Sequence, residues 1–150
     1  VITPNVVEYG RIAEALKLEQ DTDISKLTKQ LDGPTVIRKG RVDEICGFSG
    51  KDGLPDDRIV MKCDTKGSPR RPGGLGDFLA GSAIVLLSWS MRRYGGTKKV
   101  LDHRVRACHA ATTVVREASR LAFAKRKRGM IARDLLSEIS VAFEKYCPTS

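Results

Sequence analysis

The chain has 150 residues and a mass of 16.5 kDa, which is the size of one ordinary domain. Apolar residues make up 41% of it and charged residues 30%, so a core can form and wholesale disorder is excluded. The 27 Lys and Arg against 18 Asp and Glu leave a net charge of +9. Such a surplus favours a polyanionic partner, which can be a nucleic acid, an anionic membrane or a phosphorylated small molecule.

The chain order of predicted elements indicates an α/β protein with few strands and several helices. Capping signals and apolar spacing predict helices over residues 7–18 and 24–31. Short β-branched runs predict strands over 35–38, 42–46 and 58–64, with a turn over 50–57 between the last two. Three further helices are expected over 77–92, 101–125 and 134–146.

Two of these helices have distinctive surfaces. The helix over 77–92 is apolar nearly all round, so we expect it to be buried. The helix over 101–125 carries a stripe of mostly small residues that suits close packing: Val105, Cys108, Ala111, Val115, Ala118 and Ala122. Three short strands cover the first of these helices only in part, and Val1-Ile2 is typical of the end of a strand. We therefore expect the chain to be a portion of a larger domain.

The cysteines and the apolar runs bear on the compartment. The four cysteines, at positions 46, 63, 108 and 147, form no C-x-x-C pair, which argues against a zinc or redox motif and favours buried thiols. The longest apolar run, over 78–89, is too short to cross a bilayer, and the N-terminal residues do not resemble a signal peptide. We expect an intracellular protein, cytoplasmic or mitochondrial, without a membrane partner.

A glycine-rich loop gives the strongest chemical signal. Gly73, Gly74 and Gly76 precede a helix, so their backbone N–H groups and the helix N-terminus can form an anion hole for a phosphoryl group. Asp77, in the first helical turn, can accept the proton of an attacking hydroxyl. The spacing matches neither a P-loop nor a dinucleotide-binding fingerprint, and a loop capped by an aspartate for stability alone is an equal alternative.

Basic residues near this loop are the next candidates. Arg70 and Arg71 could pair with phosphate oxygens, although loop arginines are more often solvated. Lys39-Gly40 ends an apolar strand, where α/β sheets bind ligands, but a plain turn is as good an interpretation. The run over 125–128, KRKR, could bind nucleic acid, yet we favour a solvated helix end. His103 and His109 lie six residues apart, which is not the spacing of a metal pair.

Several segments together resemble one known family. They are TPNVVE at 3–8, VIRKG at 36–40 with Asp43 soon after, GSPRRPGGLGD at 67–77 followed by LAG at 79–81, and the final helix over 134–146. In this order they resemble the eukaryotic ATP-dependent NAD(P)H-hydrate dehydratases of the ribokinase-like superfamily. The resemblance covers nearly all 150 residues and corresponds to the C-terminal half of that family. It implies a partial three-layer α/β/α fold and a single domain portion over 1–150.

The resemblance also implies an activity, a metabolite-repair lyase reaction. Members restore NADH and NADPH from their hydrated forms with ATP, by phosphorylation of the ring hydroxyl and loss of phosphate, and Mg²⁺ accompanies the nucleotide. Asp77 would be the catalytic base. The residues that would bind ATP are Lys39, Gly40, Arg41, Val42, Asp43, Gly67, Ser68, Pro69, Arg70, Arg71, Pro72, Gly73, Gly74, Leu75 and Gly76. The residues that would contact the hydrate are Asn5, Val6, Val7, Glu8, Tyr9, Gly10, Arg11 and Asp77.

Two other functions remain open from the sequence. A ribokinase-like kinase for a vitamin or sugar hydroxyl would use the same loop and aspartate, and a basic nucleic-acid-binding module would use the run over 125–128. We favour a small-molecule partner and no nucleic acid. We further expect these 150 residues alone to be inactive or weakly active, with self-association into a homo-oligomer left open.

Overall fold

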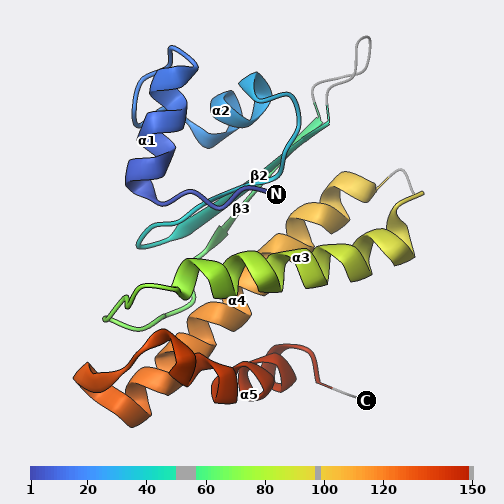
Figure 1. Cartoon of the computed structure of the whole chain (residues 1–150). Coiled ribbons are helices and arrows are strands. Elements are labelled where there is room, and N and C mark those ends of the chain that lie inside the picture. The colour runs from blue at the N-terminus through green and yellow to red at the C-terminus, as the bar shows by residue number, and fades with distance from the viewer. Residues whose placement is uncertain (50–56, 97–98, 149–150) are drawn as a thin grey trace.

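The computed structural model describes residues 1–49, 57–96 and 99–148, without the side chains of Ser49 and Asp57. The predicted order of two helices, three strands and three helices is confirmed (Figure 1). Except for Asp57, the turn predicted over 50–57 lies outside the described residues. The elements are α1 (Val6–Ala15), α2 (Ile24–Gln30), β1 (Val36–Arg38), β2 (Asp43–Ser49), β3 (Asp57–Cys63), α3 (Leu75–Tyr94), α4 (Val100–Arg126), two short 3₁₀ turns (Lys127–Gly129 and Ala132–Leu135) and α5 (Leu136–Tyr146).

The three strands form an antiparallel meander in the order β1-β2-β3. The N-terminal residues run beside β1 in parallel, where the Ile2 N–H donates to the Thr35 carbonyl at 2.9 Å and the Lys39 N–H donates to the Pro4 carbonyl at 2.8 Å. This pairing brings the start of α1 next to Lys39 at the end of β1. Two segments more than thirty residues apart in the sequence therefore meet at one edge of the sheet.

The sheet has a separate core on each face because successive strand residues point to opposite sides. Val36 and Cys46 pack against α1 and α2, whereas Ile37 and Ile45 pack against α3 and α4. Figure 1 shows α1 and α2 on one side of the sheet and α3, α4 and α5 on the other. The described residues thus form an α/β arrangement in which a small sheet lies between two helical layers.

Helix α4 is the central element of the larger core. The predicted stripe is confirmed, since all six of its residues are buried. The helix approaches β2 closely at Gly47, where an added Cβ would lie 2.6 Å from Val105 Cγ2 and 2.8 Å from Leu101 Cδ1. A side chain at position 47 would therefore push the sheet away from α4.

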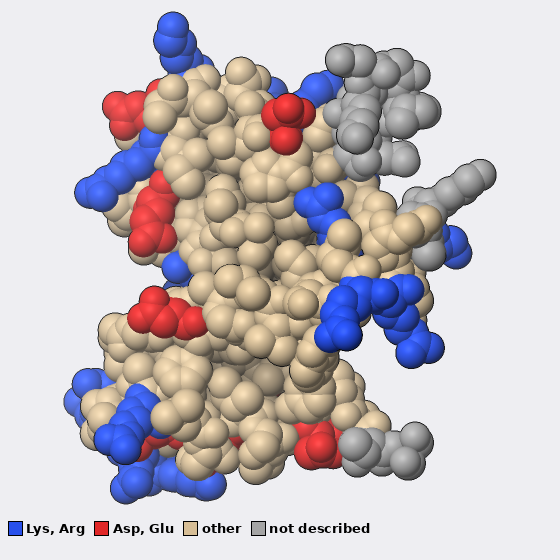
Figure 2. Space-filling view, turned by 45° about the vertical axis from the view of Figure 1, so that its right-hand side comes forward, with Lys and Arg blue, Asp and Glu red and all other residues tan. Residues whose placement is uncertain are grey.

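The prediction that the helix over 77–92 is buried all round is wrong for this chain. In α3 only Leu79 and Ala83 are buried, while Ile84 is 60% exposed and Trp89 is 55% exposed. Helix α4 packs along α3, but the described neighbours of α3 leave much of its apolar surface exposed. Figure 2 shows a largely uncharged surface at the level of α3 and α5, with charged side chains mainly toward the margins.

The cysteine and membrane expectations can also be compared with the structure. Cys46, Cys63 and Cys108 are buried as free thiols, whereas Cys147 is partly exposed rather than buried. Across the described parts of the chain, no helix combines the length and hydropathy that a membrane span requires.

Helices α4 and α5 are joined by buried carboxylates. Glu117, with its side chain 4% exposed, accepts two hydrogen bonds from Arg120 at 2.7 and 2.8 Å and one from Lys145 of α5 at 2.8 Å. Glu138 of α5, 2% exposed, accepts from Lys125 of α4 at 2.7 Å. The Arg120 guanidinium, aided by Lys145, lowers the pKa of Glu117 from 4.5 to about 2.

This lowered pKa predicts an acid-dependent loss of stability. The ion pair stabilises the fold fully above pH 4.5, the ordinary pKa, and the stabilisation is lost as the pH falls from there toward about 2. We expect the thermal unfolding midpoint, followed by circular dichroism, to fall across that window, and Glu117→Gln to remove part of the slope. Glu14→Gln, an exposed substitution on α1, should leave the slope unchanged. Equal slopes in the wild type and Glu117→Gln would contradict the assignment.

Candidate functional site

A pocket of about 610 Å³ lies where the β1–β2 turn, the loop before α3 and the middle of α4 meet. Its walls come from segments far apart in the sequence. The turn contributes Lys39, Arg41, Val42 and Asp43; the loop and the start of α3 contribute Asp64, Lys66, Gly67, Ser68, Pro69, Arg71, Leu75, Gly76 and Leu79; and α4 contributes Thr112, Val115, Arg116 and Ser119. Most residues predicted to bind ATP are thus brought together, and several of the lining side chains are cationic.

The N-terminus of α3 opens onto this pocket. Its cap residue, Gly74, has φ +94° and ψ −12°, a left-handed conformation that glycine adopts without a steric cost, and no side chain caps the helix. Gly76 in the first turn lines the pocket, and an added Cβ there would lie 3.4 Å from Lys39 Nζ. The positive end of the helix dipole and a lysine ammonium therefore face one space, which suits a phosphate.

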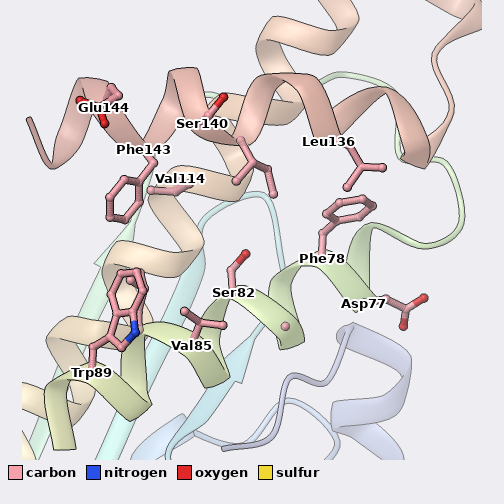
Figure 3. A pocket seen from close by; sticks show the side chains of 13 residues that line it. Asp77, Phe78, Ser82, Val85, Trp89, Val114, Leu136, Ser140, Phe143 and Glu144 are labelled. Atoms are coloured by element: carbon pink, nitrogen blue, oxygen red, sulfur yellow. The ribbon is translucent and has the colours of Figure 1, made fainter. Parts of the chain in front are cut away.

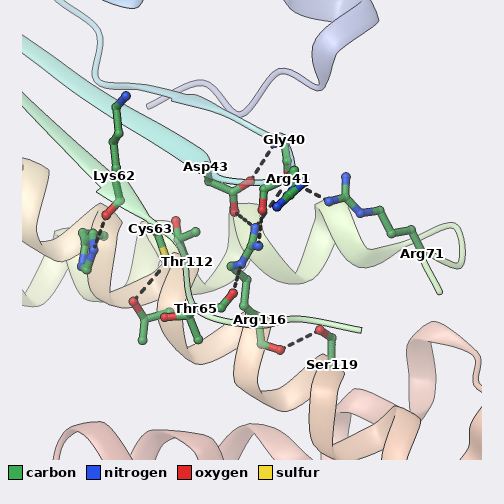
Figure 4. Close-up of polar contacts among 12 residues, drawn as sticks. Gly40, Arg41, Asp43, Lys62, Cys63, Thr65, Arg71, Thr112, Arg116 and Ser119 are labelled. Carbon is green, nitrogen blue, oxygen red and sulfur yellow. Dashed lines mark hydrogen bonds and ion pairs between the residues drawn. The ribbon is translucent and has the colours of Figure 1, made fainter. Parts of the chain in front are cut away.

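The β1–β2 turn is held in place by hydrogen bonds to its backbone (Figure 4). The Gly40 N–H donates to Asp43 Oδ1 at 2.7 Å, and the Arg71 guanidinium donates to the Gly40 carbonyl at 2.7 Å. Arg116 donates to Asp43 Oδ2 at 2.8 Å and to the Arg41 carbonyl at 2.6 Å. Arg71 therefore contacts the turn as well as lining the pocket.

Arg116 and Ser119 are site residues that the sequence analysis missed. They lie one turn apart on α4, and Ser119 Oγ accepts from the Ser68 N–H at 3.0 Å. The signal that could have found Arg116 is its position in a long buried stretch, residues 111–119, where a charged side chain needs fixed partners.

Not every residue predicted to bind ATP lines the pocket. Arg70 turns away from it, and its Nε donates to the Met130 carbonyl at 3.0 Å. Gly40 belongs to the β1–β2 turn and Gly74 caps α3, so both shape the pocket walls without lining the pocket. Pro72 and Gly73 lie in the loop before α3 and do not line the pocket either. The roles of these residues stay predictions.

Asp77 lies in the first turn of α3 and is exposed. It follows Gly76 but lines a second, apolar groove of about 720 Å³ between α3 and α5. In that groove the Trp89 and Phe143 rings meet edge to face, with centroids 6.2 Å apart. Figure 3 shows Asp77 at one end of the groove with its carboxylate pointing away from the aromatic side chains. The carboxylate is therefore open to a reactant beside the start of α3.

The predicted substrate segment, residues 5–11, forms the first turns of α1. Asn5 and Glu8, the sequence signal for the start of this helix, form a capping box: the Asn5 N–H donates to Glu8 Oε2 at 2.7 Å, and the Glu8 N–H donates to Asn5 Oδ1 at 2.9 Å. Glu8 Oε2 also lies 3.6 Å from Lys39 Nζ, which links this segment to the pocket. The Asn5 N–H, together with Lys39, lowers the pKa of Glu8.

Within residues 5–11, the side chains differ in their access to a ligand. Tyr9 is buried in the smaller core, where its hydroxyl donates to the Thr22 carbonyl at 2.8 Å and Arg38 stacks on its ring. Gly10 is buried too, whereas Val6, Val7 and Arg11 are exposed. Tyr9 thus anchors α1, and the exposed residues are the ones open to a substrate.

Side chains of the types that bind metal ions are few in the pocket lining. Within the described ranges, no three His, Cys, Asp or Glu side chains gather as metal ligands. The two histidines contact different partners: His103 stacks on Tyr94, and His109 contacts the Lys62 carbonyl. Mg²⁺ that travels with a nucleotide is held mainly by phosphates and one or two carboxylates. Asp64 lines the pocket, is exposed and would suit that lesser role, whereas both Asp43 oxygens already accept from Gly40 and Arg116.

Comparison with known proteins gives one consistent family. The family model described as NAD(P)H-hydrate dehydratase matches residues 1–141. The chain is similar to proteins named ATP-dependent (S)-NAD(P)H-hydrate dehydratase from Mycosarcoma maydis, at 38% identity over 97% of this chain and 44% of that protein, and from Entamoeba histolytica, at 34% identity over 97% and 44%. The protein of that name from Arabidopsis thaliana is 34% identical over 100% of this chain and 40% of its own length. The chain therefore spans less than half the length of these relatives.

Proposed function

Because the chain belongs to the NAD(P)H-hydrate dehydratase family, we propose that it carries the ATP site and the catalytic base of an ATP-dependent (S)-NAD(P)H-hydrate dehydratase. The reaction would be a carbon–oxygen lyase step that restores NADH or NADPH from a hydrated form. We further propose that the 150 residues are the C-terminal portion of one ribokinase-like α/β domain. The main support for this proposal is the pocket that both Lys39 and the start of α3 line.

The cationic lining is the reason to expect a triphosphate. Lys39, Arg41, Lys66 and Arg71 surround a pocket that also receives the positive end of α3. Guanidinium groups pair well with phosphate oxygens, and lysine serves as a point charge beside them. When bound there, ATP supplies the phosphoryl group that turns a hydroxyl into a leaving group, and Mg²⁺ would neutralise part of its charge.

The residues of this chain then act on the hydrate. Asp77 would accept the proton of the ring hydroxyl, since its carboxylate is exposed beside Gly76. The exposed side of the first turns of α1 would orient the hydrate, because Glu8 is tied to Lys39 and so keeps that segment next to the nucleotide pocket. The substrate and the nucleotide would thus meet at the start of α3.

The test is turnover with defined substrates. The longest polypeptide that carries this sequence should release ADP from ATP only when NADPH hydrate is present, and the absorbance of NADPH should return in step. The 150 residues alone should bind ATP by calorimetry. Absence of both ATP binding and hydrate-dependent ADP release would overturn the proposal.

The same experiment separates the alternative functions. A kinase for a vitamin or sugar would give a stable phosphorylated alcohol and would leave NADPH hydrate unchanged. A nucleic-acid module would bind RNA or DNA in a salt-sensitive way that is lost when residues 125–128 are neutralised. Lys125 and Arg126 already pair with Glu138 and Asp134, which favours a surface role for that run.

A further inference from the structure

Arg116 combines a position in the middle of α4 with contacts to both loops of the pocket. Its side chain is 15% exposed. Its Nε donates to the Thr65 carbonyl at 2.5 Å, its Nη1 to Asp43 Oδ2 at 2.8 Å and its Nη2 to the Arg41 carbonyl at 2.6 Å. A guanidinium has five N–H groups in a fixed plane, and here each of its three nitrogens donates to a protein acceptor. Figure 4 shows this side chain between the turn and the segment at Thr65.

The acceptors lie in two segments that separate where the β2–β3 pairing ends, at Asp43 and Cys63. Arg41 and Asp43 lie in and after the β1–β2 turn, whereas Thr65 lies in the loop that leads to the glycines. The Asp43 carboxylate, 7% exposed, has its second oxygen bonded to the Gly40 N–H. Arg116 is therefore the charge partner of a buried carboxylate that itself shapes the turn carrying Lys39.

Loss of this guanidinium would leave several polar groups without donors at once. Asp43 would become a buried carboxylate without its cation, and two backbone carbonyls would lose their N–H partners. The turn and the loop could then relax away from each other. Since Lys39 and Arg41 are on one side and Gly67 to Gly76 are on the other, the spacing of the phosphate-facing groups would change.

We propose that Arg116 is a positioning residue that sets the distance between the two ATP-facing segments. The inference rests on the proposed ATP site. Arg116 does not need to touch the nucleotide for this role, because the contacts that carry it are made to Thr65, Asp43 and Arg41 of the protein. It acts through the turn and the loop, much as an outer residue holds a metal ligand in its correct orientation.

The test compares Arg116→Lys with Arg106→Lys. Lysine keeps the charge but lacks the planar fork, so it cannot serve the three acceptors together. We expect Arg116→Lys to weaken ATP binding, measured by calorimetry on the folded protein, by roughly 10- to 100-fold. Arg106, an exposed residue of α4 that pairs with Asp102, is the matched control, and Arg106→Lys should bind ATP as the wild type does.

A second variant tests the same contact from its other side, and unfolding measurements identify any folding defect. Asp43→Asn keeps the shape of the side chain and removes the charge that Arg116 meets, so it should weaken ATP binding in the same direction. The double variant should be less affected than the product of the two single effects, because both changes break the same contact. Unfolding midpoints of all variants, measured without ATP, show whether each one is folded at the assay temperature.

The outcomes separate this inference from the function on which it rests. A wild-type protein that binds no ATP overturns the proposed function and this role with it. A wild type that binds ATP, with unchanged affinity in folded Arg116→Lys, overturns the positioning role alone. Independent effects of Asp43→Asn and Arg116→Lys would also overturn it, since the two would then not act through one contact.

Discussion

Replacing Asp77 with alanine should lower hydrate-dependent turnover by about 100- to 10,000-fold while ATP binding persists. The carboxylate is exposed in the first turn of α3 and lies outside the lining of the ATP pocket. Its loss would therefore remove a proton acceptor without removing a contact of the nucleotide. The measurement is steady-state turnover of NADPH hydrate with ATP, beside calorimetric titration with ATP.

A second acid in a matching position provides the control for Asp77. Asp102 lies in the first turn of α4, as Asp77 lies in the first turn of α3, and it pairs with Arg106 at 2.7 Å. An acid at either position interacts favourably with the helix dipole. Asp102→Ala should therefore lower stability to a similar extent and leave turnover intact. Near wild-type turnover in Asp77→Ala would show that another group is the base.

The predictable part of the fold is the part governed by local patterns. Cap signals at Asn5 and the small-residue stripe of α4 identify elements whose bounds lie within a few residues of those observed. The burial of α3 was not predictable in this way. Its composition is that of a covered helix, but cover depends on which elements pack beside it, and the described neighbours of α3 leave side chains such as Ile84 and Trp89 exposed.

The residues of the candidate site likewise differ in whether local sequence patterns predict them. Gly74 and Asp77 could be found from sequence because glycine conformation and helix termini impose local chemistry. Arg116 could be noticed only as a charge in a largely apolar helix, and its role could not be predicted, because its acceptors at Arg41 and Thr65 become neighbours only in the folded chain. The separation of Asp77 from the ATP pocket, despite its place next to Gly76, was equally a matter of tertiary geometry.

Gly74→Ala should damage both stability and the phosphate site. At φ +94° an alanine is strained by roughly 1–2 kcal/mol, and its Cβ would lie 3.0 Å from the Cβ of Ala132. For a domain of about this size, that strain should lower the unfolding midpoint by about 2 to 8 °C. The Gly74 carbonyl accepts from the Asp77 and Phe78 N–H groups at 3.1 and 3.3 Å, so any shift there also moves the helix start.

The neighbouring glycine separates strain at position 74 from a general effect of adding a methyl group to the loop. Gly73 does not have a positive φ, and an added Cβ there would meet nothing within 4 Å. Gly73→Ala should therefore keep the wild-type unfolding midpoint, whatever its effect on ATP. Gly74→Ala should lose stability and also bind ATP more weakly, because the start of α3, whose Gly76 lies beside Lys39, would shift. Equal midpoints for the two variants would mean that the left-handed turn does not fix the start of α3.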